Sequence, residues 1–452
     1  MILGRLTPTL TLVAALAAQT PAQAQWWWSP SQKAAPQKKA APATPPQPPQ
    51  QAVATPAPAG PGTPADAPAQ PDPSFLAFLR ELWPDAQAKG VTRATFDMAF
   101  AGVTPDPRVM TIITQRQPEF GRPAGAYLSS MVSKTRIETG TRKATEFATT
   151  LNAVEERYGV DRFIVLAIWG IETSYGAGAT DRWDVIRSLA TLAQARHRHP
   201  YFRDELITAL QILQDRHIPR NAMLGSFAGA MGQPQFMPSS FMSYAVDFSG
   251  DGKRDIWTNV PDVLGSIGNY MQKYGWKPGL APAFEVVAPP GFDHRMSRGS
   301  FDDWRLVGFR RADGAAFPAE GDAILFFPSG ARGPAFLVTD NFVVIKRYNN
   351  SDVYALAVSH LADRVQGRGP IRAEWPADDR QPTMSERIAL QHKLAELGYS
   401  VRNFTGHLDF DLRDAIREVQ VKSGMVPDGH PSPPLLDRIG VKVARPAATP
   451  PP

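Results

Sequence analysis

The chain has 452 residues, of which 43% are hydrophobic and 20% are charged, and it contains no cysteine. This length suffices for one sizeable hydrophobic core and a small additional domain, while the lack of cysteine excludes a disulfide framework and a thiol for lipid attachment. The formal net charge of +5 comes from scattered Lys and Arg, without a block of five or six basic residues. Such a diffuse excess is mild support for an anionic matrix and does not indicate nucleic acid.

The N-terminus is typical of an exported protein. Residues 1–24 are a predicted secretory signal, with Arg5 before the apolar segment Leu10–Ala18 and a small-residue cleavage site at the end. The apolar segment is too short to span a bilayer, so we expect a soluble periplasmic protein without membrane association. Residues 25–72 are rich in Pro, Ala and Gln and are predicted to form a disordered linker. Trp26–Trp28 is either an anchor on membrane or glycan or an incidental feature, and we assign it no role.

Order is expected to begin at Pro73, where apolar residues start to recur with helical spacing. The same spacing runs through most of the first half of the chain and indicates a helical domain. Predicted helices cover Thr92–Phe100, Thr141–Tyr158, Asp161–Thr173, Ile186–Leu213 and Pro261–Tyr274.

Further along the chain, short β-rich segments alternate with Gly and Pro turns. A helix is expected to resume after Asn350 and to end near Gly367. The fold class is therefore α+β, mainly α, with a small β-rich subdomain inside the main domain. Predicted strands are Phe284–Val287, Ala323–Phe327, Phe336–Val338 and Phe342–Ile345. Predicted domains are a main domain over 73–368, a linker over 369–383, a small helical domain over 384–440 and a disordered tail over 441–452.

Glu172 is an acidic residue in an apolar context. It follows the nine uncharged residues Phe163–Ile171, which read as a buried helix that ends at a glycine turn. Burial disfavours the charged form of a carboxyl group and raises its pKa, which suits a general acid that protonates a glycosidic oxygen near neutral pH. The alternative is a structural Glu that pairs with an Arg or caps a neighbouring helix.

The segment Gly225–Ser240 is rich in small residues and contains the polar side chains of Ser226 and Gln235. By itself it could be a tight helix–loop packing site or a place where the backbone approaches a ligand. Together with Ala167–Gly176 it resembles the lytic murein transglycosylase B family, lysozyme-like enzymes of bacterial cell-wall turnover. The resemblance extends from Phe75 to Leu361 and includes Gln117–Phe120, Tyr127 and Arg347–Tyr354.

This resemblance implies that Glu172 is the sole catalytic carboxylate and that no cofactor takes part in catalysis. The family cleaves the β-1,4 bond between N-acetylmuramic acid and N-acetylglucosamine and forms a 1,6-anhydro sugar. Glu172 would protonate the leaving oxygen and then take the proton of the muramic acid 6-hydroxyl, with help from the substrate's acetamido group. Asp181 and Asp184 are the nearest candidates for a second carboxylate, but helix-capping roles are expected for them.

The resemblance also implies a set of substrate-binding residues. Ser226 would hydrogen-bond near the acid or the acetamido group, and Gln235 would bind the sugar. The implied remaining residues are Tyr348 and Asn349, which close the groove, and Tyr127, Tyr270 and Tyr354, whose ring faces suit sugar rings. Ordinary core packing is the alternative for each tyrosine.

Residues 247–258 match an EF-hand calcium loop in part. Asp247, Ser249 and Asp251 occupy positions one, three and five, and Lys253 would offer its backbone carbonyl. Thr258 stands where the twelfth-position Glu is usual, and the family resemblance makes Asp262 the substitute ligand, one residue further along than expected. The site would hold a structural Ca²⁺; the alternative is a metal-free Asx-rich turn.

The C-terminal unit resembles the three-helix peptidoglycan-binding domain of wall enzymes, with Asp409–Asp411 departing from the usual Gly-Pro-type turn. It implies peptidoglycan glycan strands as partner and substrate, without nucleic acid, and cell-wall synthesis or division proteins as possible recruiting partners. His392 and His407 are expected at exposed polar positions instead of a metal site. A hydrolytic muramidase and a non-catalytic wall-binding protein are the competing functions.

Overall fold

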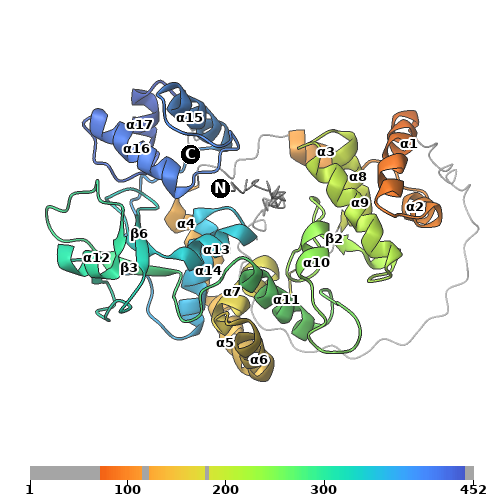
Figure 1. Ribbon diagram of the computed structural model, residues 1–452, viewed down its shortest axis with the longest axis horizontal. Coiled ribbons are helices and arrows are strands. Elements are labelled where there is room, and N and C mark those ends of the chain that lie inside the picture. Colours follow the sequence, from red (N-terminus) through yellow and green to blue (C-terminus); the bar gives the residue numbers. More distant parts are fainter. Residues whose placement is uncertain (1–71, 115–121, 179–182, 443–452) are drawn as a thin grey trace, which may run out of the picture.

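The computed structural model describes residues 72–114, 122–178 and 183–442 (Figure 1). The predicted signal segment, Trp26–Trp28, Gln117–Phe120 and Asp181 lie outside these residues. Within the described part of the chain, no helix combines the length and the apolar character needed to cross a bilayer. Helices dominate, as expected for a mainly α fold.

Helix α7 (Arg162–Thr173) forms the centre of the molecule, and every residue from Ile164 onward is buried. Asp161 caps it by accepting hydrogen bonds from the backbone N–H groups of Phe163 and Ile164. The predicted helix is confirmed. Four helices pack around α7: α5 (Lys134–Glu146), α6 (Ala148–Tyr158), α11 (Val260–Lys273) and α14 (Asp352–Val365).

Most of the remaining helices of the first half lie at one end of the molecule, whereas α4 packs against α14 (Figure 1). The predicted helix Ile186–Leu213 is wrong as a single element, because α8 and α9 pack against each other as a pair. Arg196 and Arg198 have φ of 51° and 47°, and Pro200 disfavours helical backbone before it, so the chain turns back. The bounds are α1 Pro73–Ala88, α2 Arg93–Phe100, α3 Pro107–Thr114, α4 Ala124–Met131, α8 Val185–Gln194, α9 Tyr201–Gln214, a 3₁₀ turn Arg220–Ala222 and α10 Pro238–Tyr244.

The β-rich subdomain is a five-stranded antiparallel sheet in the order β4-β6-β7-β3-β5, at the other end of the molecule from α1 and α2. Its own core contains Phe284, Trp304 and Leu325. The bounds are β3 Ala283–Val287, β4 Arg298–Ser300, α12 Phe301–Val307, β5 Arg310–Arg311, β6 Asp322–Phe326 and β7 Ala335–Val338, with the separate pair β1 Trp183–Asp184 and β2 Leu224–Gly225 elsewhere.

The predicted strand Phe342–Ile345 is wrong, because these residues lie in helix α13 (Asp340–Tyr348). Phe342 and Ile345 are three residues apart and both fully buried, which is the spacing of one helix face. The side chain of Asn341 fixes the helix start by hydrogen-bonding the backbone of Lys277 and Leu280. Tertiary packing thus overrides the β preference of a Val-Val-Ile run.

The C-terminal domain consists of α15 (Met384–Glu396), α16 (Phe410–Lys422) and α17 (Pro433–Arg438) around a small leucine-rich core. The segment before it, predicted as a linker, has no regular secondary structure but packs against the main domain (residues 73–368). Asp379 accepts hydrogen bonds from the backbone N–H of Ala124 and from the hydroxyl of Ser329. The C-terminal domain therefore lies next to the β-rich subdomain and α13 in Figure 1.

Candidate active site

Glu172 lies in the last turn of α7 and is almost completely removed from solvent, with 8% of the residue exposed. Its Oε1 accepts a 2.5 Å hydrogen bond from the hydroxyl of Tyr354 in the first turn of α14. No cation among the described residues forms an ion pair with this carboxyl group, whose pKa responds to burial and to Tyr354. The structural alternative, a Glu paired with an Arg, is not what these residues form.

Burial raises the pKa of Glu172 to about 8, and the hydrogen bond from Tyr354, which favours the carboxylate, offsets only part of the rise. The group is therefore protonated at neutral pH and can donate a proton. Its conjugate base is correspondingly stronger than an ordinary glutamate. One side chain with this pKa can act first as an acid and then as a base.

Two further tyrosines surround the carboxyl group. Burial raises the pKa of Tyr127 in α4 and of Tyr348 at the end of α13, and the charge of Glu172 raises both further. These phenols therefore remain neutral and keep their hydroxyl protons. Helices α4, α13 and α14, all distant in the sequence from Glu172, thus place neutral phenols near one acid.

The backbone directly after the acid turns sharply. Ser174, Tyr175 and Gly176 have φ values of 51°, 61° and 80°, which is uncommon for two non-glycine residues in a row. The ring of Tyr175 folds back over Gly170, where an added Cβ would lie 2.5 Å from Tyr175 Cζ. Glycine at this position lets the corner close tightly beneath Glu172.

The small-residue segment forms a compact loop. Gly225 must be glycine, because a Cβ there would lie 1.9 Å from the carbonyl oxygen of Ala230. Ser226 Oγ accepts hydrogen bonds from the backbone N–H groups of Ala228 and Ala230, at 3.3 and 3.0 Å. The half-buried hydroxyl thus stabilises the loop, and no described residue accepts its proton. Gln235, at φ 55°, donates to the carbonyl of Gly232 at 2.7 Å.

The other predicted sugar-binding residues, Tyr348, Asn349 and Tyr270, are buried near the acid or packed against Tyr348. Tyr348 donates to the carbonyl of Pro234 at 2.5 Å, and Asn349 is buried directly after it. Tyr270 donates to the carbonyl of Arg347 at 2.5 Å, and its ring centroid lies 4.8 Å from that of Tyr348. With its hydroxyl engaged and 5% exposure, Tyr270 fits the core-packing alternative.

Asp184, the nearest described candidate for a second carboxylate, is engaged elsewhere. It caps α8 by accepting the backbone N–H of Arg187 at 2.9 Å, and it forms a 2.8 Å ion pair with Arg220. Helix capping, the role expected for it, is confirmed.

The candidate calcium loop brings Asp247, Asp251 and Asp262 together, with one oxygen from each within 4.8 Å of the others. Asp262 is fully buried and accepts hydrogen bonds from the backbone N–H groups of Phe248 and Ser249, so the longer spacing still reaches the loop. Three convergent carboxylates are hard oxygen ligands of the type that Ca²⁺ prefers. The donor set therefore fits a divalent cation.

Comparison with known proteins identifies both domains. Residues 74–363 match the transglycosylase SLT domain, and residues 383–439 match a peptidoglycan-binding domain. The chain belongs to the transglycosylase SLT family. The predicted enzyme class, lytic transglycosylase, and the predicted lysozyme-like, mainly helical fold are thereby confirmed.

Individual relatives agree with this assignment. The transglycosylase is 33% identical over 261 residues to membrane-bound lytic murein transglycosylase B of Escherichia coli K12, covering 56% of this chain and 70% of the relative. SltB3 from Pseudomonas aeruginosa, in complex with NAG-anhNAM-pentapeptide, is similar with a TM-score of 0.74 and 42% identity over 81% of this chain and 100% of SltB3. Slt35 from Escherichia coli, in complex with calcium, is similar with a TM-score of 0.55 and 28% identity over 65% of this chain and 93% of Slt35.

The structure of the transglycosylase also reveals a residue that the sequence did not single out. Gln233 Oε1 accepts a hydrogen bond from the indole of Trp169 at 2.8 Å, while its Nε2 donates to the carbonyl of Trp257 at 2.8 Å. Its own carbonyl accepts the hydroxyl of Thr173 at 3.0 Å. Gln233 therefore joins the acid-bearing helix to the small-residue loop. The sequence could have pointed to Gln233, because it lies in the same small-residue segment two residues before Gln235.

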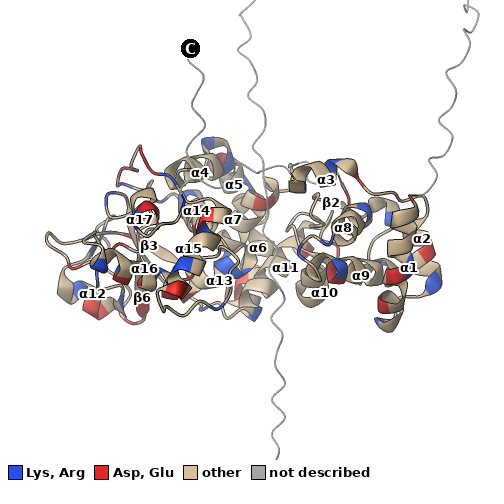
Figure 2. Ribbon diagram, turned by 90° about the horizontal axis from the view of Figure 1, so that it is seen from above, with Lys and Arg blue, Asp and Glu red and all other residues tan. Residues whose placement is uncertain are grey.

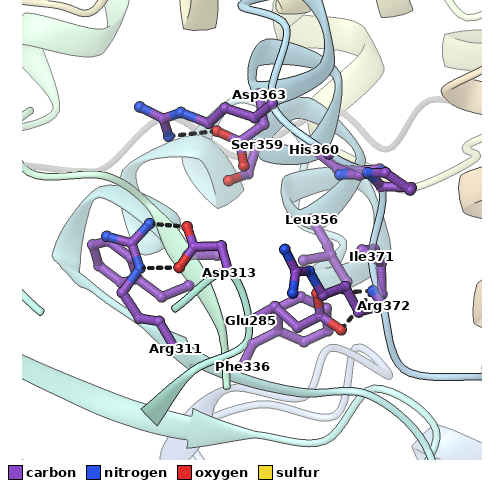
Figure 3. A pocket seen from close by; sticks show the side chains of 15 residues that line it. Glu285, Arg311, Asp313, Phe336, Leu356, Ser359, His360, Asp363, Ile371 and Arg372 are labelled. Carbon is purple, nitrogen blue, oxygen red and sulfur yellow. Dashed lines mark hydrogen bonds and ion pairs between the residues drawn. The ribbon is translucent and has the colours of Figure 1, made fainter. Parts of the chain in front are cut away.

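A cavity of about 100 Å³ lies away from Glu172, between the C-terminal half of α14 and the sheet (Figure 3). Ion pairs line it, formed by Arg311 with Asp313 and by Asp363 with Arg368, and Glu285 accepts the backbone N–H of Arg372. These groups have partners within the protein, and the contact between Glu285 of β3 and Arg372 attaches the segment after α14 to the sheet. Elsewhere, acidic and basic residues alternate over the molecule (Figure 2), in agreement with the diffuse basic excess.

Replacing Glu172 by Gln should stabilise the folded protein, more at high pH than at low pH. The folded pKa of about 8 lies above the ordinary value of 4.5, so the wild type loses stability as pH rises through this window, whereas an amide does not titrate. Relative to wild type, the free energy of unfolding of Glu172→Gln should rise by roughly 3 kcal/mol between pH 5 and pH 8. Urea unfolding at both pH values measures it. Glu156→Gln, at an exposed position, is the control; equal behaviour of the two variants contradicts the prediction.

Replacing Tyr354 by Phe should raise the pKa of Glu172 further, because the hydroxyl that favours the carboxylate is lost. The titration of the ¹³C-labelled Glu172 carboxyl group by NMR measures this shift. Tyr274→Phe, which removes a hydroxyl that bonds Tyr244 instead, serves as the matched control. An unchanged titration in Tyr354→Phe would show that the hydrogen bond does not control the acid.

Proposed function

We propose that the transglycosylase cleaves the β-1,4 bond between N-acetylmuramic acid and N-acetylglucosamine and leaves 1,6-anhydromuramoyl ends, with Glu172 as single acid and base. The observation that carries this proposal is a buried carboxyl group with a pKa of about 8 whose described partner is a neutral tyrosine. The group is protonated when substrate arrives and strongly basic after it has given up its proton.

In the first step the Glu172 proton moves to the glycosidic oxygen, and the bond between this oxygen and the muramic acid anomeric carbon breaks. The substrate's acetamido carbonyl stabilises the positive charge at that carbon. In the second step the Glu172 carboxylate takes the proton of the 6-hydroxyl, whose oxygen attacks the anomeric carbon. No water is consumed, and Glu172 ends protonated as it began.

The remaining residues have positioning and binding roles in this proposal. Tyr354 orients Glu172, and Asn349 orients the acetamido group. Ser226 donates its unused hydroxyl proton to the substrate, and Gln235 shapes the loop beside it. Tyr127 and Tyr348 complete the neutral surroundings that keep the acid protonated.

A relative that binds an anhydro sugar supports this chemistry. SltB3 has been crystallised with NAG-anhNAM-pentapeptide and with NAG-NAM-pentapeptide, which are an anhydro sugar and its non-anhydro counterpart. A hydrolytic muramidase would release a hydrated product instead of an anhydro sugar, and a non-catalytic wall-binding protein would need no perturbed acid. We further propose that the protein acts in the periplasm, which the predicted secretory signal and the cell-wall substrate support.

Digestion of purified peptidoglycan should release anhydro-muropeptides with the wild type. Glu172→Gln should release them at least about 10³-fold more slowly, because the amide can neither donate nor accept the required proton. Mass spectrometry separates the outcomes, since a hydrolysed product is heavier than its anhydro counterpart by one water. Hydrated products from the wild type would favour the muramidase, and the absence of any product would favour the binding protein.

We propose that Ca²⁺ binds Asp247, Asp251 and Asp262, with Ser249 and the Lys253 carbonyl as additional ligands, and that its role is structural. The relative Slt35 with calcium supports this assignment. The ion would offset most of the negative charge of the three adjacent carboxylates and fix the start of α11.

Calcium should raise the melting temperature of the protein, because a ligand that binds only the folded state stabilises it, by about 2.7 kcal/mol at 100 times its Kd. Asp251→Asn should reduce this shift while leaving the calcium-free melting temperature nearly unchanged, since Asp251 is exposed. Magnesium is the control ion. A wild-type melting temperature that does not respond to calcium contradicts the assignment.

A further inference from the structure

The C-terminal domain contacts the catalytic domain through a buried group of charges. Asp352, the first residue of α14, forms a 2.6 Å ion pair with Lys346 of α13 and a second 2.6 Å ion pair with Arg413 of α16. The three side chains are 12%, 9% and 8% exposed. Burial raises the pKa of Asp352, but the two cations outweigh it and hold the pKa below its ordinary value. Asp352 is therefore a charged anchor between the domains.

Additional contacts connect the same two surfaces. His407 lies with Nδ1 3.2 Å from the carbonyl oxygen of Asn350, and Lys346 Nζ donates to the carbonyl of Leu408 at 3.4 Å. The ring of Phe410 packs against Phe342, with centroids 6.3 Å apart. The contact thus combines ion pairs, hydrogen bonds and apolar packing.

The catalytic segment attached at this contact is the one that supplies the groups around the acid. Residues 346–354 include Tyr348, Asn349 and Tyr354, and Asp352 stands two residues before the tyrosine that hydrogen-bonds Glu172. Asp352 and Tyr354 both lie in the first turn of α14, so a shift of this end of the helix moves both of them. A displacement of about 1 Å at a reacting group can lower a rate by about 10²-fold.

We propose that the C-terminal domain is a working part of the active site: Arg413 acts through Asp352 to hold the start of α14 so that the Tyr354 hydroxyl reaches Glu172. Arg413 and Asp352 are positioning residues in this scheme. The inference rests on the proposed function, because it concerns the acid assigned there. It differs from a tethering role, in which the domain only raises the local concentration of enzyme on the polymer.

A second charged contact between the same domains provides a matched control. Arg298 of β4 forms ion pairs with Asp411 and Asp414 of α16, at 2.8 and 2.9 Å, but its side chain is 45% exposed. It joins the same two domains at a different place from the 346–354 segment. A variant here weakens domain contact without touching the anchor of α14.

The test uses the full chain carrying Arg413→Met and a short soluble glycan fragment as substrate. Asp352→Asn is avoided as the main variant, because it would leave two buried cations unpaired and endanger folding. Arg413→Met still leaves Asp352 paired with Lys346. We expect kcat to fall about tenfold or more with little change in KM. We also expect the alkaline limb of the pH profile to move upward, as in Tyr354→Phe, since Glu172 loses the hydrogen bond from Tyr354 that favours its carboxylate.

Arg413→Lys should recover part of the lost kcat, whereas Arg298→Gln should behave as the wild type on the same fragment. Wild-type kcat and an unshifted pH profile in Arg413→Met would overturn the inference, as would an equal loss in Arg298→Gln. Failure of the proposed function has a different signature, because the wild type itself would then yield no anhydro product from the fragment.

Discussion

The removal of one carboxyl group from water is the constraint on which the rest of the active site depends. Glu172 ends a helix whose residues from Ile164 onward are all buried, so its charged form lacks solvation and its pKa rises to about 8. A nearby cation would reverse this effect. The surrounding tyrosines instead add no charge, so burial keeps the carboxylic acid neutral under conditions in which free glutamate is ionised, although the Tyr354 hydroxyl offsets part of the effect.

Keeping the acid in place requires structure that is not itself reactive. The positive φ values of Ser174 and Tyr175 turn the chain immediately after Glu172, and Gly170 gives the Tyr175 ring the space that this turn needs. Gln233 then joins the helix to the loop that carries Ser226. Backbone strain at such a corner persists only because the packing around it fixes it.

The domain contact extends the same principle across the molecule. A buried anion between cations is costly to break, since each charge that loses its partner remains desolvated. Asp352 has this character, and it lies in the helix that supplies Tyr354. The contact with the C-terminal domain and the proposed acid–base chemistry of the catalytic domain thereby meet in one short segment of chain.

The sequence by itself determined the features that are encoded locally. The uncharged run before Glu172 specified a buried helix with an acid at its end, and the acidic spacing from Asp247 specified a loop of converging carboxylates, although it left the reach of Asp262 uncertain. Local patterns suffice there because neighbours in sequence are neighbours in space. They failed at Phe342–Ile345, where β-branched residues favour a strand and burial of one face makes a helix.

Only the tertiary structure decided which groups meet the acid and how the domains are joined. Tyr354 is 182 residues from Glu172, and Arg413 is 61 residues from Asp352. The sequence named Tyr354 only as a ring that could face a sugar, because no local rule states which distant hydroxyl will reach a buried carboxyl group. Such pairings arise from the packing of whole helices, which fixes the separation and the solvation of the side chains between them.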